Sequence, residues 1–285
     1  MLVTEVPPVA IKPLVCNKIE AGKSAFTAAC FEGTDWSLGP IQKSEHVQAN
    51  LGLASQVGAA LWGLGVRRAY APSPIEFNAR IINPKILDRD IPLPYGVHLF
   101  RNQEVPADGT ILRKQGDAGV FSAGGCSVVV ATLGDEIIFA HAGRECVLDR
   151  TRVLTDGMEK GRWVESVVDN IVSALTPHHN LRQYLRAWVF YSIKPEDFVH
   201  RSDDPDPKHA AYNKAAADYL PQKFGSEFGW AEKAALYIDI PRIIKAQFHR
   251  LGVEHVSLEH AYLANELPHT RNGGGRYLVA IVRNS

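Results

Sequence analysis

The chain has 285 residues, 46% hydrophobic and 22% charged, a composition typical of globular proteins with a large buried core. Basic and acidic residues both number 31, so the net charge of zero gives no sign of a nucleic-acid-binding face. Charged residues interrupt every apolar run before the roughly 18 residues of a membrane span, and the N-terminus has no apolar run of signal-peptide length.

The four cysteines, Cys16, Cys30, Cys126 and Cys146, are too few for a disulfide framework and show no C-x-x-C spacing. This pattern is typical of a reducing compartment. We therefore expect a cytoplasmic protein, and the charge balance and the interrupted apolar runs predict no nucleic-acid or membrane partner. The sequence gives no indication of a protein partner.

Apolar residues recur at helical spacing from Lys43 to Leu64, and Gly65 ends this predicted helix. Two extended segments follow, 79–82 and 97–100, separated by a proline-rich connection. A long strand over 118–133 and a second over 136–141 then form a hairpin that turns at Gly134 and Asp135. Each strand contains a continuous apolar run, 128–130 in the first and 137–140 in the second. Side chains of such a run point to both faces, which predicts burial on both sides of a sheet.

The second half of the chain is predicted to contain helices over 163–175 and 238–251 and strands over 186–193 and 276–281. Between them, 201–230 mixes Asp-Pro pairs with an alanine-rich helix and is predicted to be a surface insertion. The sequence shows no internal repeat and no low-complexity linker. A single α+β domain over residues 1–285 is therefore the simplest organisation.

Cys126 and His141 are the residues most able to do chemistry. They are 15 positions apart, and the predicted hairpin brings them close together. Glycines beside Cys126 leave its sulfur open to a ligand. A cysteine and a histidine in contact can form a nucleophile and its base or can share a zinc ion, and the spacing alone does not decide between these uses.

Three segments resemble the signature of the bacterial laccase-domain family, also called YfiH-like. They are Ala107-Asp108-Gly109, Ala123-Gly124-Gly125-Cys126 and His141-Ala142-Gly143-Arg144, which are similar to A-D-A, T-A-D-C and H-A-G-W-R-G in that family. The interval of 18 residues from Asp108 to Cys126 is also typical. Weaker similarity continues on both sides, in 45–65, 192–198, 250–254 and 271–276.

The resemblance implies a compact αββα sandwich with a zinc site of His, Cys and His beside a nucleoside pocket. It also implies phosphorolysis of purine nucleosides, with adenosine deamination in some members. By position, Cys126 and His141 match the second and third ligands. Copper, which the laccase label implies, suits a three-ligand Cys and His site poorly, so we expect zinc.

The first zinc ligand is not matched directly. Counting from Gly65 places Phe77 where the family has its histidine, and Phe77 cannot bind a metal. The alternative is His98, in Gly96-Val97-His98, which completes an expected ligand set of Cys126, His141 and His98. Gly125 also replaces the aspartate of A-D-C.

Arg144, or alternatively Arg162, is the expected binder of phosphate or of a substrate carboxylate. Together with Cys126 and His141, Arg144 makes the expected catalytic set. Three functions stay open on this evidence. They are a zinc-dependent purine nucleoside phosphorylase, a metal-free Cys–His hydrolase or deamidase, and a non-enzymatic binding protein that retains the fold.

Overall fold

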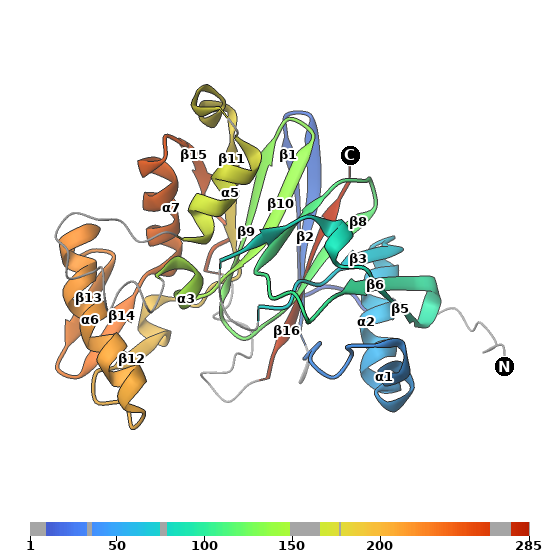
Figure 1. The fold of residues 1–285 in the computed structure, drawn as a ribbon, viewed down its shortest axis with the longest axis horizontal. Helices are drawn as coiled ribbons and strands as arrows, with labels where there is room; N and C mark the ends of the chain where they lie inside the picture. The colour runs from blue at the N-terminus through green and yellow to red at the C-terminus, as the bar shows by residue number, and fades with distance from the viewer. Residues whose placement is uncertain are drawn as a thin grey trace.

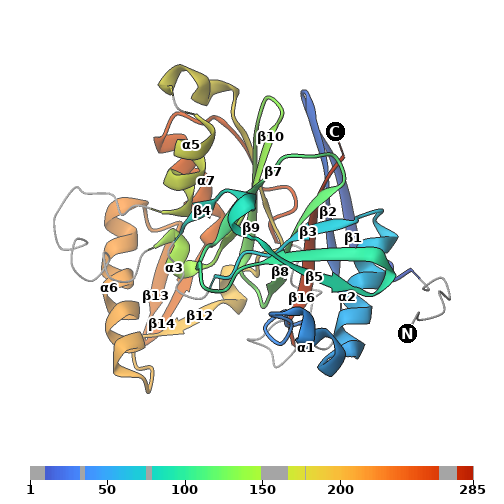
Figure 2. The ribbon, with the colours of Figure 1, turned by 45° about the vertical axis from the view of Figure 1, so that its right-hand side comes forward.

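In the computed structural model, the described residues are 10–32, 36–74, 79–148, 166–176, 178–262 and 275–284. Two large β-sheets lie face to face, and helices cover their outer sides (Figures 1 and 2). The first sheet has seven strands in the order β1 (Val15–Ala21), β2 (Ser24–Phe31), β16 (Tyr277–Arg283), β8 (Asp117–Ala123), β3 (Arg68–Tyr70), β6 (Val97–Arg101) and β5 (Arg89–Leu93).

The second sheet has six strands in the order β15 (His255–Ser257), β11 (Arg186–Phe190), β9 (Ser127–Leu133), β10 (Glu136–Ala142), β7 (Gly109–Leu112) and β4 (Ile81–Ile82). A small third sheet has the order β12 (Val199–Arg201), β14 (Ala235–Ile238) and β13 (Gly229–Glu232). The predicted hairpin is present, with β9 and β10 paired antiparallel in the middle of the six-stranded sheet.

Helices form the two outer layers. Helices α1 (Ser44–Ala49) and α2 (Leu51–Gly63) lie against the seven-stranded sheet, and α2 packs Ala54, Val57 and Leu61 into a core cluster with it. On the other side, the six-stranded sheet shares a core cluster with α3 (Arg144–Val147), α5 (Val167–Leu175), α6 (Pro207–Lys223) and α7 (Ile240–Arg250). The layers therefore follow the predicted αββα order.

A third core cluster fills the space between the two sheets. Phe26 and Phe121 come from the seven-stranded sheet, and Val130 and Phe139 come from the six-stranded sheet. Gly119 on β8 lets the sheets approach here, because a Cβ at this position would lie 2.2 Å from the Phe139 ring. Close packing between the sheets fixes the relative positions of strands that carry site residues.

The predicted long strand over 118–133 is wrong, because the chain leaves one sheet and enters the other within it. Strand β8 ends at Ala123 in the seven-stranded sheet, and β9 begins at Ser127 in the six-stranded sheet. Gly125 makes the turn with φ of +114°, a backbone conformation that only glycine adopts readily. Cys126 consequently lies at the crossing between the two sheets.

Other predicted elements are present with small changes of bounds. The first predicted helix is divided into α1 and α2 at Asn50. The helix predicted from 163 begins at Val167, because Ser166 caps it and its side chain accepts from the Val168 N–H; 163–165 lie outside the described residues. The segment 201–230 is folded, and α6 contributes Tyr212 and Leu220 to the largest core cluster. Within the described residues, no helix is long and apolar enough to cross a membrane.

Candidate active site at the ends of the parallel strands

A cavity of about 340 Å³ lies where the parallel strands β3, β6 and β8 end. Ligands commonly bind at the carboxyl ends of parallel strands, because loops diverge there and leave space. The chemically important residues of its lining are Arg101, Gln103, Ser122, Cys126, His141 and Arg276. Its volume is within the range of small-molecule pockets, about 300–1,000 Å³.

The structure brings Cys126 and His141 together. In the β9–β10 hairpin Val128 is paired with His141 and Ser127 with Ala142, so Cys126 comes next to the histidine. The thiol of Cys126 is hydrogen-bonded with the imidazole. A Cβ placed on Gly143 would lie 3.0 Å from His141 Nε2 and 3.4 Å from Cys126 Sγ, so a larger residue there would press on both groups.

Asp108 holds the other side of the His141 ring. Its Oδ1 lies 3.1 Å from His141 Nδ1, and its Oδ2 accepts a hydrogen bond of 2.7 Å from the backbone N–H of Ala79. Asp108 is fully buried and His141 is 6% exposed. A buried carboxylate on Nδ1 fixes the orientation and tautomer of the imidazole and leaves Nε2 for chemistry.

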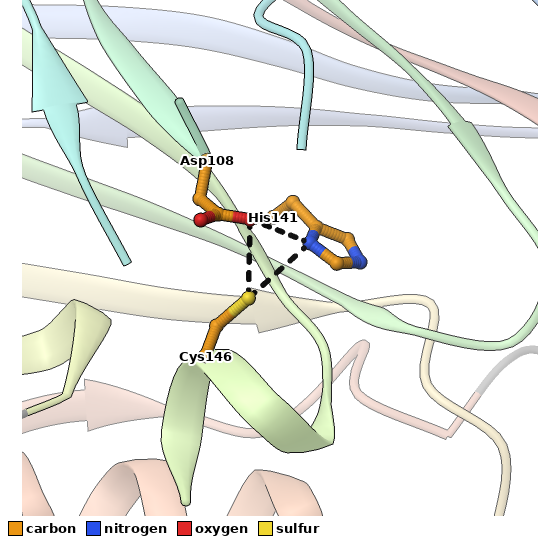
Figure 3. Close-up of side chains that lie close together, drawn as sticks. All are labelled: Asp108, His141 and Cys146. Carbon is orange, nitrogen blue, oxygen red and sulfur yellow. Dashed lines mark hydrogen bonds and ion pairs between the residues drawn. The ribbon is translucent and has the colours of Figure 1, made fainter. Parts of the chain in front are cut away.

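Cys146 completes a compact triangle with these two residues, and Figure 3 shows it on the first turn after β10, pointing toward both partners. Its Sγ lies 3.1 Å from Asp108 Oδ1 and 3.5 Å from His141 Nδ1. All three side chains are buried, and their ligand atoms lie within 4.8 Å of one another. The group can therefore hold a metal ion.

The donor set of this triangle fits zinc. Zinc bonds of about 2.0–2.1 Å to nitrogen or oxygen and about 2.3 Å to sulfur imply tetrahedral ligand separations of roughly 3.3–3.6 Å. The sulfur–nitrogen separation of 3.5 Å lies within this range, and the two separations from Asp108 Oδ1, both 3.1 Å, are a few tenths of an ångström shorter. The ligand atoms are one oxygen, one nitrogen and one sulfur, a combination that suits this borderline-soft ion.

Burial and neighbouring groups act in opposite directions on His141. Burial by itself lowers the pKa, but the Cys146 sulfur and the hydrogen bonds with Asp108 and Cys126 outweigh it and raise the pKa above its ordinary value. Burial raises the pKa of the Cys146 thiol to about 12, so without a metal this thiol is neutral. Without a metal, the hydrogen bonds with Asp108 and Cys126 therefore favour the protonated form of the imidazole.

His98 is not part of this site, which corrects the expected ligand set. Its side chain is half exposed, and Nδ1 lies 2.9 Å from Asp90 Oδ1 on the neighbouring strand β5. Arg68 of β3 is paired with His98 on one side and with Asp117, the first residue of β8, on the other. His98 therefore lies level with the start of β8. The cavity begins three residues further along these strands, at Arg101 and Val120, about 10 Å away at the usual rise per residue.

Arg144 also points elsewhere. Its guanidinium donates to Asn213 Oδ1 and lies over the Tyr212 ring, 4.4 Å from the centroid. It lines a separate cavity beside α6 together with His200. The arginines that line the cavity of Cys126 and His141 are Arg101 and Arg276. The other two expected residues, Phe77 and Arg162, lie outside the described residues.

Three site residues were missed as functional groups by sequence reasoning. Asp108 was noted only as part of a motif, yet the pairing of Gly109 with Ala140 places it beside His141. Cys146 was noted only as a departure from the family motif. No sequence motif marked Arg101 as a site residue. It reaches the cavity because β6 pairs in parallel with β3, and no local pattern predicts that pairing.

These features define the class of protein as a two-sheet sandwich with a Cys and His pair in contact at its strand ends. No family model matches the sequence, and no curated protein does so. Solved structures with the same fold do exist. The Neisseria meningitidis protein NMB0706, of family DUF152, has a TM-score of 0.58 at 15% identity, over 95% of this chain and 99% of its own.

Two further structures are similar over nearly their whole lengths. YlmD from Geobacillus stearothermophilus has a TM-score of 0.55 at 15% identity, with 93% of each chain covered. The hypothetical protein YfiH from Bacillus licheniformis has a TM-score of 0.52 at 13% identity, with 91% of each chain covered. The chain therefore has the YfiH-like fold, as the motif resemblance predicted.

Proposed function

We propose that the protein is an enzyme that cleaves purine nucleosides with phosphate in the cavity that Cys126 and His141 line. The observation that carries the proposal is the buried Asp108–His141 pair at the wall of a ligand-sized cavity, with Cys126 on the open side of the imidazole. The purine class is supported by the motif resemblance. The fold supports it at the level of architecture alone.

In this reaction the bond from C1′ to the base breaks while phosphate forms a new bond to C1′, and the departing purine takes up a proton. His141 is suited to supply that proton, because Asp108 stabilises its protonated form. Arg276 and Arg101 give the cavity the positive charge that phosphate requires. A zinc ion held by Asp108, His141 and Cys146 would instead take the place of the shared proton between Asp108 and His141 and would supply Lewis-acid chemistry, so the two arrangements are alternatives.

The test is release of free purine from adenosine, inosine and methylthioadenosine, each with and without phosphate. We expect phosphate-dependent release that falls by about 10²–10⁴-fold in His141→Ala, the usual contribution of a positioned acid. His98→Ala is the matched control, since this histidine pairs with Asp90 away from the cavity. Absence of release from all three nucleosides would contradict the proposal.

Metal content separates two ligand sets, because His141 is common to both. If Asp108, His141 and Cys146 hold zinc, Cys146→Ser loses the ion and Cys126→Ser keeps it. If Cys126 is a ligand, as the motif resemblance implies, Cys126→Ser loses it. Mass-spectrometric metal analysis of the three purified proteins, including the wild type, decides between them.

A second candidate function is a metal-free Cys–His hydrolase or deamidase, favoured by the chain of contacts from Asp108 through His141 to Cys126. His141 would take the Cys126 proton, and the thiolate would attack an amide or amidine carbon. This function predicts turnover that needs no phosphate, survives chelation and leaves a covalent adduct on Cys126. Nucleoside binding without turnover in any assay would instead indicate a binding protein.

A further inference from the structure

Arg101 is a cation buried at the wall of the cavity. It is the last residue of β6 and is only 5% exposed. Its Nη1 donates to two backbone carbonyls, those of Leu38 and Ile41, and its Nη2 donates to Ser73 Oγ at 3.4 Å. These contacts fix the plane of the guanidinium, because they come from two different loops on one side of it.

One nitrogen of this guanidinium, Nε, has no partner, and the neighbouring Nη2 has one. Nη1 uses both of its hydrogens on the two carbonyls, whereas Nε is buried and makes no hydrogen bond. Nη2 has a second hydrogen besides the one directed at Ser73. One of the two Nη2 hydrogens points in the same direction as the Nε hydrogen, and this edge of an arginine can bind two oxygens of a phosphate or carboxylate at once.

Within the part of the chain that the structure describes, no acidic side chain pairs with Arg101. Among the ion pairs of the described residues none includes it, and its three hydrogen-bond acceptors are all uncharged. Burial lowers the pKa to about 10, so the side chain still carries its charge at neutral pH. A buried charge without a counter-ion is unfavourable, and proteins keep one where a ligand completes it.

We propose that the Nε–Nη2 edge of Arg101 is an oxyanion subsite that binds a phosphate group, with Ser73 beside it and Arg276 on the same cavity. This inference rests on the proposed function in one respect, since it assigns the phosphate position in the same cavity as His141. The phosphate has two chemical sources. It is either inorganic phosphate, the second substrate of phosphorolysis, or the 5′-phosphate of a nucleotide.

The direct test uses the wild-type protein and the NMR signal of the Arg101 Nε–H group, assigned by its loss in Arg101→Lys. Titration with inorganic phosphate and, separately, with adenosine 5′-monophosphate is expected to move this signal in a saturable way. A shift with phosphate alone identifies the free ion as ligand, and a shift with the nucleotide alone identifies a substrate-borne phosphate. No shift with either overturns the inference.

Calorimetric titration of the variant gives the second measurement. Arg101→Lys keeps the charge and loses the two-hydrogen edge, so we expect the dissociation constant for the ligand to rise by about tenfold or more. Arg113→Lys is the matched control, an exposed arginine outside the cavity lining, and its affinity is expected to equal wild type. Equal affinity in Arg101→Lys and wild type, at matched melting temperature, overturns the inference.

The two proposals fail in different ways. If phosphate binds through Arg101 and no nucleoside is cleaved, the subsite stands and the proposed function falls. If nucleosides are cleaved with the same KM for phosphate in Arg101→Lys as in wild type, and adenosine 5′-monophosphate binds both proteins equally, the proposed function stands and the subsite falls.

Discussion

Asp108 and His141 are joined twice, once through their backbones and once through their side chains. The N–H of His141 donates to the carbonyl of Asp108 at 2.7 Å, and His141 Nδ1 lies 3.1 Å from Asp108 Oδ1. The first bond extends the pairing of β7 with β10, so the second follows from strand register. The carboxylate is thereby positioned before any ligand binds, which is the condition for efficient proton transfer.

Asp108→Asn is expected to lower kcat/KM for nucleoside cleavage by about 10²–10⁴-fold, because the amide cannot stabilise a protonated His141. The variant should also lose about 1–3 kcal/mol of unfolding free energy, since it weakens buried hydrogen bonds. Steady-state kinetics and urea unfolding measure the two effects. Asp90→Asn, which breaks the exposed pair with His98, is the control and should change neither.

Thiol labelling is expected to divide the four cysteines into two pairs. Cys16 is exposed and Cys126 is half-buried beside the cavity, so iodoacetamide should modify both in the native protein. Cys30 and Cys146 are buried, and burial raises the pKa of each thiol to about 12. Mass spectrometry after brief treatment should find no modification of these two.

The same experiment in Cys16→Ser should leave Cys126 as the single labelled site, and labelling in urea should reach all the remaining thiols. Modification of Cys30 in the folded Cys16→Ser protein would mean that the contact between β2 and its neighbouring strands is open in solution, contrary to the structure.

Gly119→Ala is expected to destabilise the fold by about 2–4 kcal/mol, in the range of overpacked cores and large core changes. The added methyl would lie 2.2–2.4 Å from three atoms of the Phe139 ring, so one sheet must move from the other. Urea unfolding of the purified variant measures the loss. Phe139→Leu in the same chain should recover part of it, because the smaller side chain leaves room for the methyl group.

Gly52→Ala is the matched control. Gly52 lies in α2, where a Cβ would have nothing within 4 Å. Alanine has the higher helix propensity, so this variant should be more stable by about 0.5–1 kcal/mol. Equal losses in the two variants would contradict the close approach of the sheets at Gly119.

Stability is expected to fall at alkaline pH because of the buried thiols. In the metal-free protein, burial raises the pKa of Cys30 and Cys146 from 9.0 to about 12, so the folded state keeps the protons that the unfolded state loses. Their contribution is therefore complete below pH 9 and is lost between pH 9 and 12. Each thiol adds a slope of about 1.4 kcal/mol per pH unit in that range.

Urea midpoints measured from pH 8 to 11 test this dependence, with Cys30→Ala as the comparison. Removal of one thiol should make the decline shallower, although the variant starts from a lower stability at pH 8 because of the cavity that it leaves. A decline of the same slope in both proteins would show that Cys30 ionises equally in the folded and unfolded states.

The sequence by itself determined the elements whose signals are local. The helical spacing over 43–64 and 238–251 and the Gly134-Asp135 turn each predicted an element that the structure contains, because periodicity and turn chemistry depend on near neighbours. The hairpin also predicted the contact between Cys126 and His141, since register follows from the turn. The family resemblance added the αββα order.

Only the tertiary structure decided which further side chains join that pair. Strand β8 and strand β9 read as one apolar segment, and the choice of sheet for each depends on packing between layers that no window of sequence contains. Arg101 reaches the cavity, and His98, three residues earlier, does not, because β6 pairs in parallel with β3 and only its final residue reaches the strand ends. Such long-range pairing fixes the site.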